Sequence, residues 1–584
     1  MKVLLTTLNA KFIHSSLAIR NLKVYSGKYS DNVSLMEFTI NQTENFMLAE
    51  IFKRKPDIIG FSCYIWNIRQ TLNMIGSIKK IMPNVKIILG GPEVSYGYEP
   101  IFYEYPADVV VIGEGEATFY ELLEHYIENK ISLSNIKGIA YKSEGRIITN
   151  PCGELLELNA IPFAYRGGFS DLDNRIIYYE SSRGCPYSCG YCLSGSDNAV
   201  RHLNIDKVLS DLALFLDAKV KQVKFVDRTF NASKRHSMAI WEFLIENDNG
   251  LTNFHFEVCA DLLSADEIEL FKNARKGLFQ FEIGIQSTNP QTLQAIGRKT
   301  NLDKIYANVR SVKEMGTIHQ HLDLIAGLPY EDYSSFKKSF NDVFAVSPEM
   351  LQLGFLKVLK GSKMCEGAAK FGIVYKDNAD YEVLSTSWLI YNEILKLKDV
   401  EHVLEIFYNS GQFICSVKYL ISFFENSFEF FEKLATFWNR KEYHSISHSK
   451  VSLYSKLYDF ALEFLKAGKI EIIKELLLFD LLSTEKLKSL PEGLPFAKEE
   501  HKEFAREFYN SKASIERHFG AKALSIPIKQ VIRSSNLVWF EYDVLGFLNE
   551  AKVKKAGCYL LFNYSGSEIS VSAVIPTCDP NNTI

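Results

Sequence analysis

The sequence predicts an α/β protein in three parts. These are a doubly wound parallel sheet, a partial (β/α)6 barrel, and a mostly helical C-terminal domain with a small β unit at its end. Short apolar strands alternate with helical patterns through roughly the first two thirds of the chain, and aromatic-rich helical periodicity follows. We place the three parts at residues 1–130, 176–366 and 367–584, with a connector at 131–175.

Composition excludes several classes of protein. The chain has 584 residues, of which 47% are hydrophobic and 23% charged, as expected for an ordinary globular protein of several domains. Its formal net charge of -4 gives no global reason to expect a nucleic-acid partner. We find neither a signal-peptide pattern nor an apolar run long enough to span a membrane, so we expect a cytoplasmic location.

The first part alternates strands and helices in the order typical of a parallel sheet covered on both faces. The expected strands are Val3–Leu8, Ile58–Ser62, Lys86–Leu89 and Val109–Ile112, and the expected helices are Leu17–Tyr25, Ile68–Met82 and Ala117–Tyr126. Ligands of such sheets bind at the carboxyl ends of the strands.

Two glycine turns fall at that edge. Gly90-Gly91-Pro92-Glu93 follows the third expected strand and Gly113-Glu114-Gly115-Glu116 follows the fourth. Glycines there let the backbone approach a large ligand closely. The turns are weak signals alone, because a nucleotide-binding domain would also place glycines there, but no G-x-G-x-x-G or P-loop motif is present.

The connector carries a hairpin signal at 138–148 and is then rich in proline and glycine. Beyond it, six strand–helix units predict the partial barrel, and barrel chemistry gathers at the carboxyl ends of the strands. The expected strands are Ile176–Glu180, Gln222–Val226, Asn253–Val258, Gln280–Ile285, Gln320–Ile325 and Leu351–Phe355.

A cysteine loop follows the first barrel strand. Cys185, Cys189 and Cys192 have the spacing C-x3-C-x2-C. Thiolates on one tight loop are ligands for iron–sulfur clusters, and three of them would leave one iron of a 4Fe-4S cluster open to another ligand. The alternative is a zinc site or a chance cluster, but zinc sites usually pair C-x2-C with a second, distant pair of ligands. Tyr191, before the last cysteine, offers a flat surface for a bound ring.

Polar and glycine residues mark the ends of the other barrel strands, where we expect a ligand. A polar group there could hold hydroxyl or amino groups, although each residue alone could equally be a solvated strand end. Glycines there would let the ligand approach the backbone. The polar candidates are Asp227, Glu257, Glu282, Gln286 and Ser287, and the glycines are Gly284 and Gly327.

The cysteine loop resembles the cluster motif of radical S-adenosylmethionine (radical SAM) enzymes. The glycine turns ahead of it make the chain similar to the cobalamin-dependent members of that superfamily. The D-x-H-x-x-G motif, which supplies a histidine to cobalt in other cobalamin proteins, is absent. The resemblance then implies that the lower cobalt face meets solvent or the 63–67 loop, with cofactor contacts at Ser62, Tyr64 and Asn67. His14 is either an axial ligand or a loop residue, and we favour the loop residue because one histidine without ligand spacing is weak evidence.

This resemblance implies three cofactors, namely a 4Fe-4S cluster, S-adenosylmethionine and cobalamin, and an electron donor such as flavodoxin or ferredoxin. It implies a 5′-deoxyadenosyl radical that takes hydrogen from an unactivated carbon of a small-molecule substrate, to which methylcobalamin then delivers a methyl group. The alternatives are a radical cyclisation or rearrangement without methyl transfer, modification of a tRNA base, and a non-catalytic cobalamin sensor, which would not need the cysteines.

The last part, from 367 on, predicts helices with an aromatic core and two short strands at 538–542 and 558–563. Seven basic residues face three acidic ones between 501 and 533, and this surface is the only hint of a nucleic-acid partner. A solvated helix face explains the same pattern, so we do not favour nucleic acid.

Overall fold

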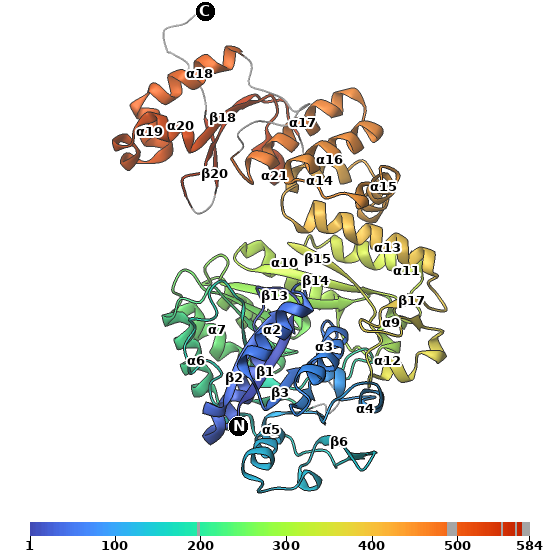
Figure 1. Cartoon of the computed structure of the whole chain (residues 1–584). Helices are drawn as coiled ribbons and strands as arrows, with labels where there is room; N and C mark the ends of the chain where they lie inside the picture. Colours follow the sequence, from blue (N-terminus) through green and yellow to red (C-terminus); the bar gives the residue numbers. More distant parts are fainter. Residues whose placement is uncertain (195–198, 487–498, 551–552, 567–568, 575–584) are drawn as a thin grey trace, which may run out of the picture. The chain divides into compact units, whose positions relative to one another are not determined.

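The structure is a computed structural model of the whole chain, and it describes residues 1–194, 199–486, 499–550, 553–566 and 569–574. The chain divides into two compact units, Met1–Ile394 and Leu395–Ile584. Figure 1 follows the elements of each unit along the sequence, from blue at the N-terminus to red at the C-terminus. The predicted boundaries within the first unit remain predictions.

The first sheet has seven strands in the order β2-β1-β3-β4-β5-β6-β7. The first five in this order pair in parallel, and the last two pairings are antiparallel. The strands are β1 Val3–Asn9, β2 Val33–Thr39, β3 Ile58–Ser62, β4 Lys86–Gly90, β5 Val109–Val111, β6 Ile139–Ser143 and β7 Arg146–Thr149.

Helices cover both faces of this sheet. Side chains alternate between the two faces along each strand, so the strands contribute apolar residues to a core on each face. Leu4 and Leu8 pack with residues of α2, α3 and α4. Val3 and Leu5 pack on the other face with residues of α1 and α5. The doubly wound arrangement predicted from the sequence is confirmed. The helices are α1 Leu17–Tyr25, α2 Glu44–Arg54, α3 Ile68–Ile81, α4 Glu99–Glu104 and α5 Glu116–Leu123, the last continued by a π-helical turn at Glu124–Glu128.

Some elements of this part lie outside those expected from the sequence. Strand β2 and helices α2 and α4 were not expected, and β2 forms one edge of the sheet. The hairpin β6–β7, which the sequence suggested as part of a connector, instead extends the sheet at its other edge through pairing of β5 with β6. Its short strands carry too little apolar alternation to reveal a partner strand.

The second sheet has six parallel strands in the order β15-β14-β13-β12-β11-β8, as predicted for a partial barrel. Its strands are β8 Ile177–Tyr179, β11 Gln222–Phe225, β12 Asn253–Glu257, β13 Phe279–Gln286, β14 His319–Ala326 and β15 Met350–Phe355. The helices between and after them are α6 Ile205–Asp217, α7 Lys234–Glu246, α8 Ala265–Phe271, α9 Pro290–Ala295, α10 Leu302–Met315, α11 Tyr333–Phe344 and α12 Lys363–Glu366.

The two faces of the barrel sheet differ in chemistry. On the outer face, Phe256 and Phe281 are fully buried against Trp241 of α7. On the inner face, Lys224, Glu257 and Glu282 keep 25% of their side-chain surface exposed. Apolar packing therefore holds the helices outside, and the inside of the barrel is polar and reached by solvent.

Two small two-stranded sheets flank the barrel. One joins β9 (Ser182–Arg183) to β10 (Arg201–His202), and the other joins β16 (Val374–Tyr375) to β17 (Val383–Ser385). Helix α13 (Tyr391–Leu404) begins at the end of the first unit and continues into the second.

The second unit is helix-rich, as predicted, and it has an antiparallel sheet of three strands, of which two were expected from the sequence. Its helices are α14 Ile414–Ile421, α15 Ser427–Arg440, α16 Lys450–Phe464, α17 Ala467–Leu482, α18 Glu499–Asn510, α19 Lys512–Phe519, α20 Ile528–Arg533 and α21 Val544–Glu550, and its strands are β18 Ser535–Phe540, β19 Cys558–Asn563 and β20 Ser570–Val574. Within the described ranges of the whole chain, no helix is both long and apolar enough to cross a membrane.

Candidate functional site

The cysteine loop begins at the first barrel strand and is closed at its base by the pairing of β9 with β10. Gly184 starts the loop with a φ of 102°, and a Cβ at this position would lie 1.9 Å from the carbonyl oxygen of Ala199. Only glycine fits so close to the returning chain. The narrow base therefore depends on a residue next to the first cysteine.

Backbone hydrogen bonds attach the same loop to the rim of the barrel. The N–H of Gly190 donates to the carbonyl of Ile296 at 2.8 Å, and the carbonyl of Gly190 accepts from the N–H of Met364 at 2.7 Å. Gly190 thus lies between the segment that follows α9 and the start of α12. The loop is held by the barrel on the side away from its base.

The three thiols have different surroundings. Cys185 and Cys189 are buried, and Cys192 is half-buried. The Sγ of Cys185 lies 3.4 Å from the hydroxyl oxygen of Thr229, and the Sγ of Cys189 lies 3.9 Å from a guanidinium nitrogen of Arg298. Across the described residues, no three His, Cys, Asp or Glu side chains form a site for a single metal ion.

Asp227, predicted as a ligand-binding residue, is hydrogen-bonded to the two residues that lead into the cysteine loop. Its carboxylate accepts hydrogen bonds from the N–H of Ser181 at 3.0 Å, from the Ser181 hydroxyl at 2.7 Å and from the Ser182 hydroxyl at 2.6 Å. Burial raises the pKa of Asp227 to about 6, although these donors stabilise the carboxylate. Asp227 thus fixes the two residues before Arg183.

Glu282 forms a charged centre inside the barrel. Its carboxylate lies 2.9 Å from Lys224 Nζ and 3.1 Å from His255 Nε2. Burial opposes ionisation, but the contacts with His255 and Lys224 outweigh it and lower the pKa of Glu282 to about 2. Glu282 is therefore already paired within the protein.

Two other carboxyl groups inside the barrel are less well compensated. Burial, followed by the repulsion of Glu282 and Glu257, raises the pKa of Asp323 to about 8. Burial also raises the pKa of Glu257 to about 6, against the attraction of Arg228 at 3.5 Å. A cation or a hydrogen-bond donor would stabilise both carboxylates.

The buried polar atoms without a hydrogen-bond partner include Gln286 Oε1, Asp323 Oδ1 and Arg298 Nε. Such atoms carry a desolvation cost unless a ligand or water satisfies them. An acid, an amide and a guanidinium match the amino, hydroxyl and carboxylate groups of S-adenosylmethionine, so the residues present fit this cofactor. We propose that Gln286, Glu257, Asp323 and Arg298 hold it beside the cysteine loop.

Sequence reasoning missed Arg298 as a site residue. It follows α9, beyond the end of β13 and far in sequence from the cysteines. Its guanidinium donates to the carbonyl of Gly284 and lies 3.5 Å from the hydroxyl of Tyr191. No motif that we recognised points to it. Asp323 lies within the expected strand Gln320–Ile325, but it was not among the site residues selected from the sequence.

Three other predicted strand-end residues make contacts within the protein. A Cβ on Gly284 would lie 2.2 Å from Gln286 Nε2, so glycine leaves room for that amide. Gly327 has a φ of 88°, and a Cβ there would lie 2.7 Å from the Val383 side chain. The hydroxyl of Ser287 donates to Glu331 at 2.6 Å. For these residues, ligand contact remains a prediction.

A large cavity of about 1280 Å³ lies between the carboxyl edge of the first sheet and the cysteine loop. Both glycine turns line it, together with Ser62, Tyr64 and residues at the base and sides of the loop. The lining includes Gly90, Gly91, Pro92, Gly113, Glu114, Gly115, Glu116, Glu180, Arg183, Gly184, Leu193 and Arg201. This volume and its glycine wall fit cobalamin, a ligand much larger than a drug-sized molecule.

The first glycine turn depends on Gly91. Its φ is 113°, and a Cβ would lie 2.5 Å from the carbonyl oxygen of Cys63. The next acid, Glu93, does not line the cavity but is buried and accepts a hydrogen bond from the Tyr381 hydroxyl, with Lys360 Nζ at 3.7 Å. This part of the turn is thus attached to the segment that follows the barrel.

The carboxylates of the second glycine turn also have partners within the protein. Glu114 contacts Arg201, and Glu116 contacts Arg183 at 2.8 Å. The backbone of the turn still faces the cavity. We therefore propose that cobalamin contacts the backbone of 113–116 rather than these two carboxylates.

The loop after β3 is held by its own asparagine. Asn67 is buried, accepts from the N–H of Tyr64 at 2.8 Å, and donates to the carbonyls of Leu8 and Ser62. These bonds occupy its amide and place Tyr64 on the cavity wall. Contact of cobalamin with Ser62 and Tyr64 remains a prediction.

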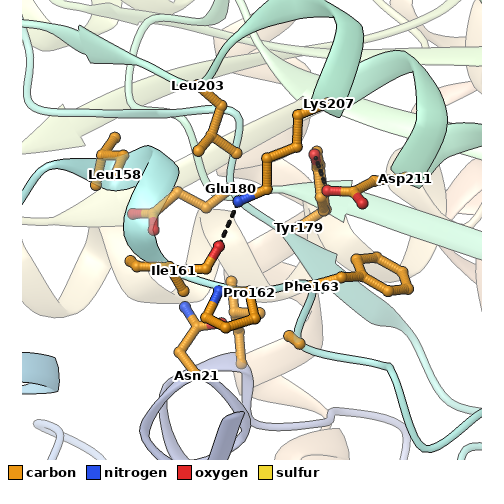
Figure 2. Close-up of a pocket in the computed structure, with 12 residues that line it drawn as sticks. Asn21, Leu158, Ile161, Pro162, Phe163, Tyr179, Glu180, Leu203, Lys207 and Asp211 are labelled. Carbon is orange, nitrogen blue, oxygen red and sulfur yellow. Dashed lines mark hydrogen bonds between the residues drawn. The ribbon is translucent and has the colours of Figure 1, made fainter. Parts of the chain in front are cut away.

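A second, much smaller cavity of about 30 Å³ lies under the segment before β8. Figure 2 shows Lys207 donating to the carbonyl of Ile161, and Tyr179 donating to Asp211 at 2.9 Å. This volume suits about one water molecule, so this cavity is too small for a cofactor.

Three family models match parts of this chain. A model of the B12 binding domain matches residues 3–123, and a model of the radical SAM superfamily matches residues 179–343. A third model, described as a protein of unknown function (DUF4080), matches residues 369–562.

Two curated relatives illustrate the range of similar proteins. The cobalamin-dependent radical SAM methyltransferase TokK of Streptomyces tokunonensis is 26% identical over 310 residues, which are 48% of this chain and 44% of TokK. The anaerobic magnesium-protoporphyrin IX monomethyl ester cyclase of Rubrivivax gelatinosus is 22% identical over 343 residues, or 56% of this chain and 60% of the cyclase. The chain thus matches about half the length of these relatives.

Among solved structures, the cobalamin-dependent S-adenosylmethionine radical enzyme OxsB with aqua-cobalamin bound superposes with a TM-score of 0.60 at 18% identity. The match covers 87% of this chain and 84% of OxsB. At this identity the match concerns the fold, and it supports the order of a cobalamin domain followed by a partial barrel.

Proposed function

We propose that this chain, in which a cobalamin-binding domain precedes a radical SAM domain, is a methyltransferase that acts on an unactivated carbon of a small molecule. Its cofactors are cobalamin, a 4Fe-4S cluster and S-adenosylmethionine, as predicted. When bound, the cluster and S-adenosylmethionine supply a carbon-centred radical that removes hydrogen, and cobalamin carries the methyl group.

One observation carries the proposal: a single cavity is lined by the glycine turns of the first sheet and by residues on both sides of the cysteine loop. A substrate between the two cofactor sites would be within reach of both. The cavity wall is mixed, with the apolar Leu193 and Val226 next to the charged Arg228. Such a wall suits a small molecule with both polar and apolar parts.

The side chains of this chain bind and orient. Cys185, Cys189 and Cys192 would bind three irons, while Arg298 places a positive charge beside Cys189. Gln286 and Asp323 would accept hydrogen bonds from S-adenosylmethionine. These contacts hold a reactive cofactor in one orientation, which favours reaction at one position of the substrate.

The test uses the full chain, reconstituted anaerobically with iron, sulfide and cobalamin. It is incubated with a reductant, candidate substrates and S-adenosylmethionine that carries an isotope-labelled methyl group. We expect 5′-deoxyadenosine and S-adenosylhomocysteine in similar amounts, and the label in the product. Formation of 5′-deoxyadenosine alone, with an unlabelled product, would overturn methyl transfer.

Radical cyclisation is the second candidate, and the similarity to a cyclase favours it. This reaction needs the cluster and S-adenosylmethionine but transfers no methyl group. In the same experiment it gives 5′-deoxyadenosine, no S-adenosylhomocysteine above the background, and a product lighter than a methylated one.

We propose a small-molecule substrate rather than RNA, and a flavodoxin or ferredoxin as the electron donor. A protein that neutralises several phosphates binds RNA with an affinity that falls steeply as salt rises. The net charge of -4 opposes such binding, so we expect no salt-dependent retention of bulk tRNA. Loss of a modified tRNA nucleoside in a strain without this gene, restored by the gene but not by its Cys189→Ala form, would favour RNA instead.

A further inference from the structure

Two arginines stand opposite each other at the base of the cysteine loop. Arg183 of β9 and Arg201 of β10 are directly paired in an antiparallel ladder. Like charges at such positions repel and destabilise the pairing. The base of the loop therefore needs acidic partners in order to close.

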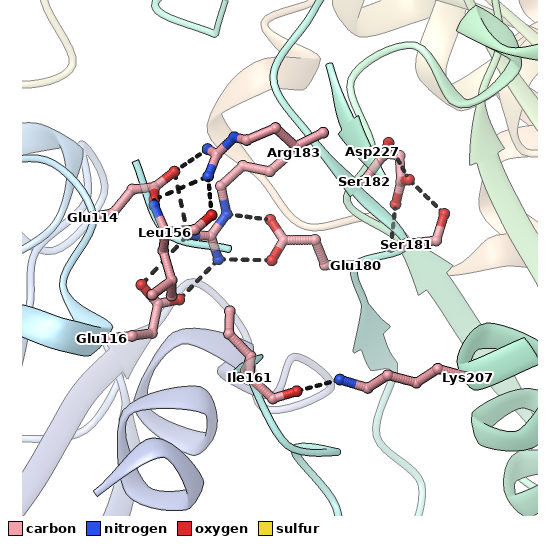
Figure 3. A network of polar contacts seen from close by, with 11 residues as sticks. Glu114, Glu116, Leu156, Ile161, Glu180, Ser181, Ser182, Arg183, Lys207 and Asp227 are labelled. Carbon is pink, nitrogen blue, oxygen red and sulfur yellow. Dashed lines mark hydrogen bonds and ion pairs between the residues drawn. The ribbon is translucent and has the colours of Figure 1, made fainter. Parts of the chain in front are cut away.

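Those partners come mainly from the second glycine turn, in the other cofactor domain. Arg183 lies 2.8 Å from Glu116 and 2.8 Å from Glu180, while Arg201 contacts Glu114. Glu114 also lies 3.5 Å from Arg183, so its carboxylate lies between the two arginines. Figure 3 shows Arg183 with Glu116 and Glu180, and Glu114 beside them.

The network is largely shielded from water. The side chain of Arg183 is 20% exposed and that of Glu116 is 8% exposed. Buried charges interact strongly, and removing one partner leaves the other uncompensated.

The same turn lines the large cavity. Gly113 and Gly115 alternate with the two glutamates, and all four residues contribute to the cavity wall. A second contact links the turn to the chain before β8, because Glu114 accepts from the N–H of Leu156 at 2.9 Å. A ligand that fixes the backbone of this turn would also fix the carboxylates that close the cysteine loop.

We propose that Glu114, Glu116, Arg183 and Arg201 are positioning residues that couple the two cofactor sites, so that cobalamin and the iron–sulfur cluster each strengthen binding of the other. The coupling is reciprocal, since a change in one affinity requires an equal change in the other. This inference rests on the two cofactor domains and not on the proposed methyl transfer.

The test measures the Kd of hydroxocobalamin by absorbance titration of the full chain, with and without the reconstituted cluster. We expect the cluster to tighten cobalamin binding by at least about fivefold, which is the lower end of typical coupling. In Glu116→Gln the ratio of the two Kd values falls towards one. Bound cobalamin should likewise slow loss of the cluster to a chelator in the wild-type chain but not in this variant.

A matched control comes from another arginine–carboxylate pair in the same unit. Asp248 accepts from Arg275 at 2.7 and 3.2 Å but lies outside the cavity wall. Asp248→Asn should lower thermal stability and keep the Kd ratio of the wild type. If Glu116→Gln fails to fold, Arg183→Lys keeps a positive charge, loses the forked contact and should lower the ratio.

The proposal is overturned if the wild-type Kd is the same with and without the cluster. It is also overturned if the wild-type ratio persists in Glu116→Gln or, where that variant does not fold, in Arg183→Lys. Neither result would affect the methyl-transfer proposal, because the titration involves neither S-adenosylmethionine nor substrate.

Discussion

The carboxyl edges of the two sheets in the first unit differ in the groups that they present to a cofactor. At the first sheet the backbone of two glycine turns lines the cavity, and the carboxylates Glu93, Glu114 and Glu116 of these turns are already bonded to other side chains. At the barrel, buried polar atoms of Gln286, Asp323 and Arg298 have no partner. The first edge therefore provides backbone that a large ligand can approach closely, and the second provides buried polar atoms that a ligand can satisfy.

The difference matches the chemistry of the two ligands. Cobalamin is large, so backbone that can approach it closely is the main requirement. S-adenosylmethionine is small and charged, so its orientation depends on a few directed contacts. Substitutions that add volume should therefore damage the first edge, and substitutions that only change polarity should damage the second.

The largest expected effect is at the cysteine loop between the two edges. Cys185→Ala, Cys189→Ala or Cys192→Ala should each abolish the cluster, because a missing thiolate leaves one iron without its protein ligand. Iron and sulfide analysis after anaerobic reconstitution should fall from about four irons per chain to near zero. Cys415→Ala is the matched control, since Cys415 is buried in the second unit, and it should keep the full cluster. A triple cysteine variant with a full cluster would refute this assignment.

Next in size is the effect of volume at the first edge. Gly91→Trp should abolish cobalamin binding, because even a Cβ would lie 2.5 Å from the backbone oxygen of Cys63. Gly115→Trp should also lower cobalamin binding, but for a different reason. A Cβ there meets only side chains, at 3.5 Å and beyond, so the bulky indole would instead take up space in the cavity that Gly115 lines. Co-purified or reconstituted cobalamin is measured by absorbance.

A glycine without this constraint serves as the control. Gly76 lies in α3, and a Cβ there would meet no atom within 4 Å. Gly76→Ala should keep cobalamin and stabilise the helix by up to about 1 kcal/mol. Normal cobalamin content in Gly91→Trp would show that cobalamin binding does not depend on close approach to this glycine turn.

A smaller effect is expected from a change of polarity at the second edge. Asp323→Asn keeps the volume but should weaken S-adenosylmethionine binding by about tenfold, the cost of one lost charge-assisted hydrogen bond. Equilibrium dialysis with the cluster-loaded chain measures this Kd. The same change should leave cobalamin binding intact, which separates the two edges. An unchanged Kd for S-adenosylmethionine would remove Asp323 from the site.

The raised pKa of Asp323 gives this variant a second signature. An aspartate in the unfolded chain has a pKa of about 3.9, whereas that of folded Asp323 is about 8. The folded state binds the proton more tightly, so Asp323 makes the ligand-free protein less stable as pH rises from about 4 to about 8. Without ligand, Asp323→Asn should therefore be more stable than the wild type at pH 8, with the gain disappearing near pH 4. Chemical unfolding at both pH values measures it.

Much of the fold could be predicted because apolar strands and amphipathic helices leave a clear periodic signal. All six barrel strands and four of the parallel strands were expected within a few residues. Strand β2 was missed because it is a half-exposed edge strand with an irregular pattern. The hairpin β6–β7 was recognised, but its partner β5 could not be identified, since pairing over such a distance leaves no local signal.

The site was predicted less completely than the fold. The cysteine spacing and the glycine turns are local patterns, and they led to the cofactors that the matched domains imply. The partners of Glu114 and Glu116 could not be predicted, because arginines about 70 to 90 residues away reach them only after the domains meet. Arg298 escaped for the same reason, since only the fold brings it to Cys189.

The smallest expected effect concerns His14, which would give the first edge a directed contact if it bound cobalt. Its Nδ1 lies 2.7 Å from the hydroxyl oxygen of Tyr178, and it forms an isolated β-bridge with Ile176. Burial and the charges of Lys11 and Lys224 lower its pKa, so the ring is neutral and bonded within the protein.

His14→Ala should leave the absorbance spectrum of bound cobalamin in the base-off form and change its Kd by less than about twofold, because the cavity wall does not include this residue. Tyr178→Phe is the control that removes only the shared hydrogen bond. A spectral shift in His14→Ala but not in Tyr178→Phe would make His14 an axial ligand. Cobalamin would then be held at the first edge by a bond to His14 as well as by contact with the glycine backbone.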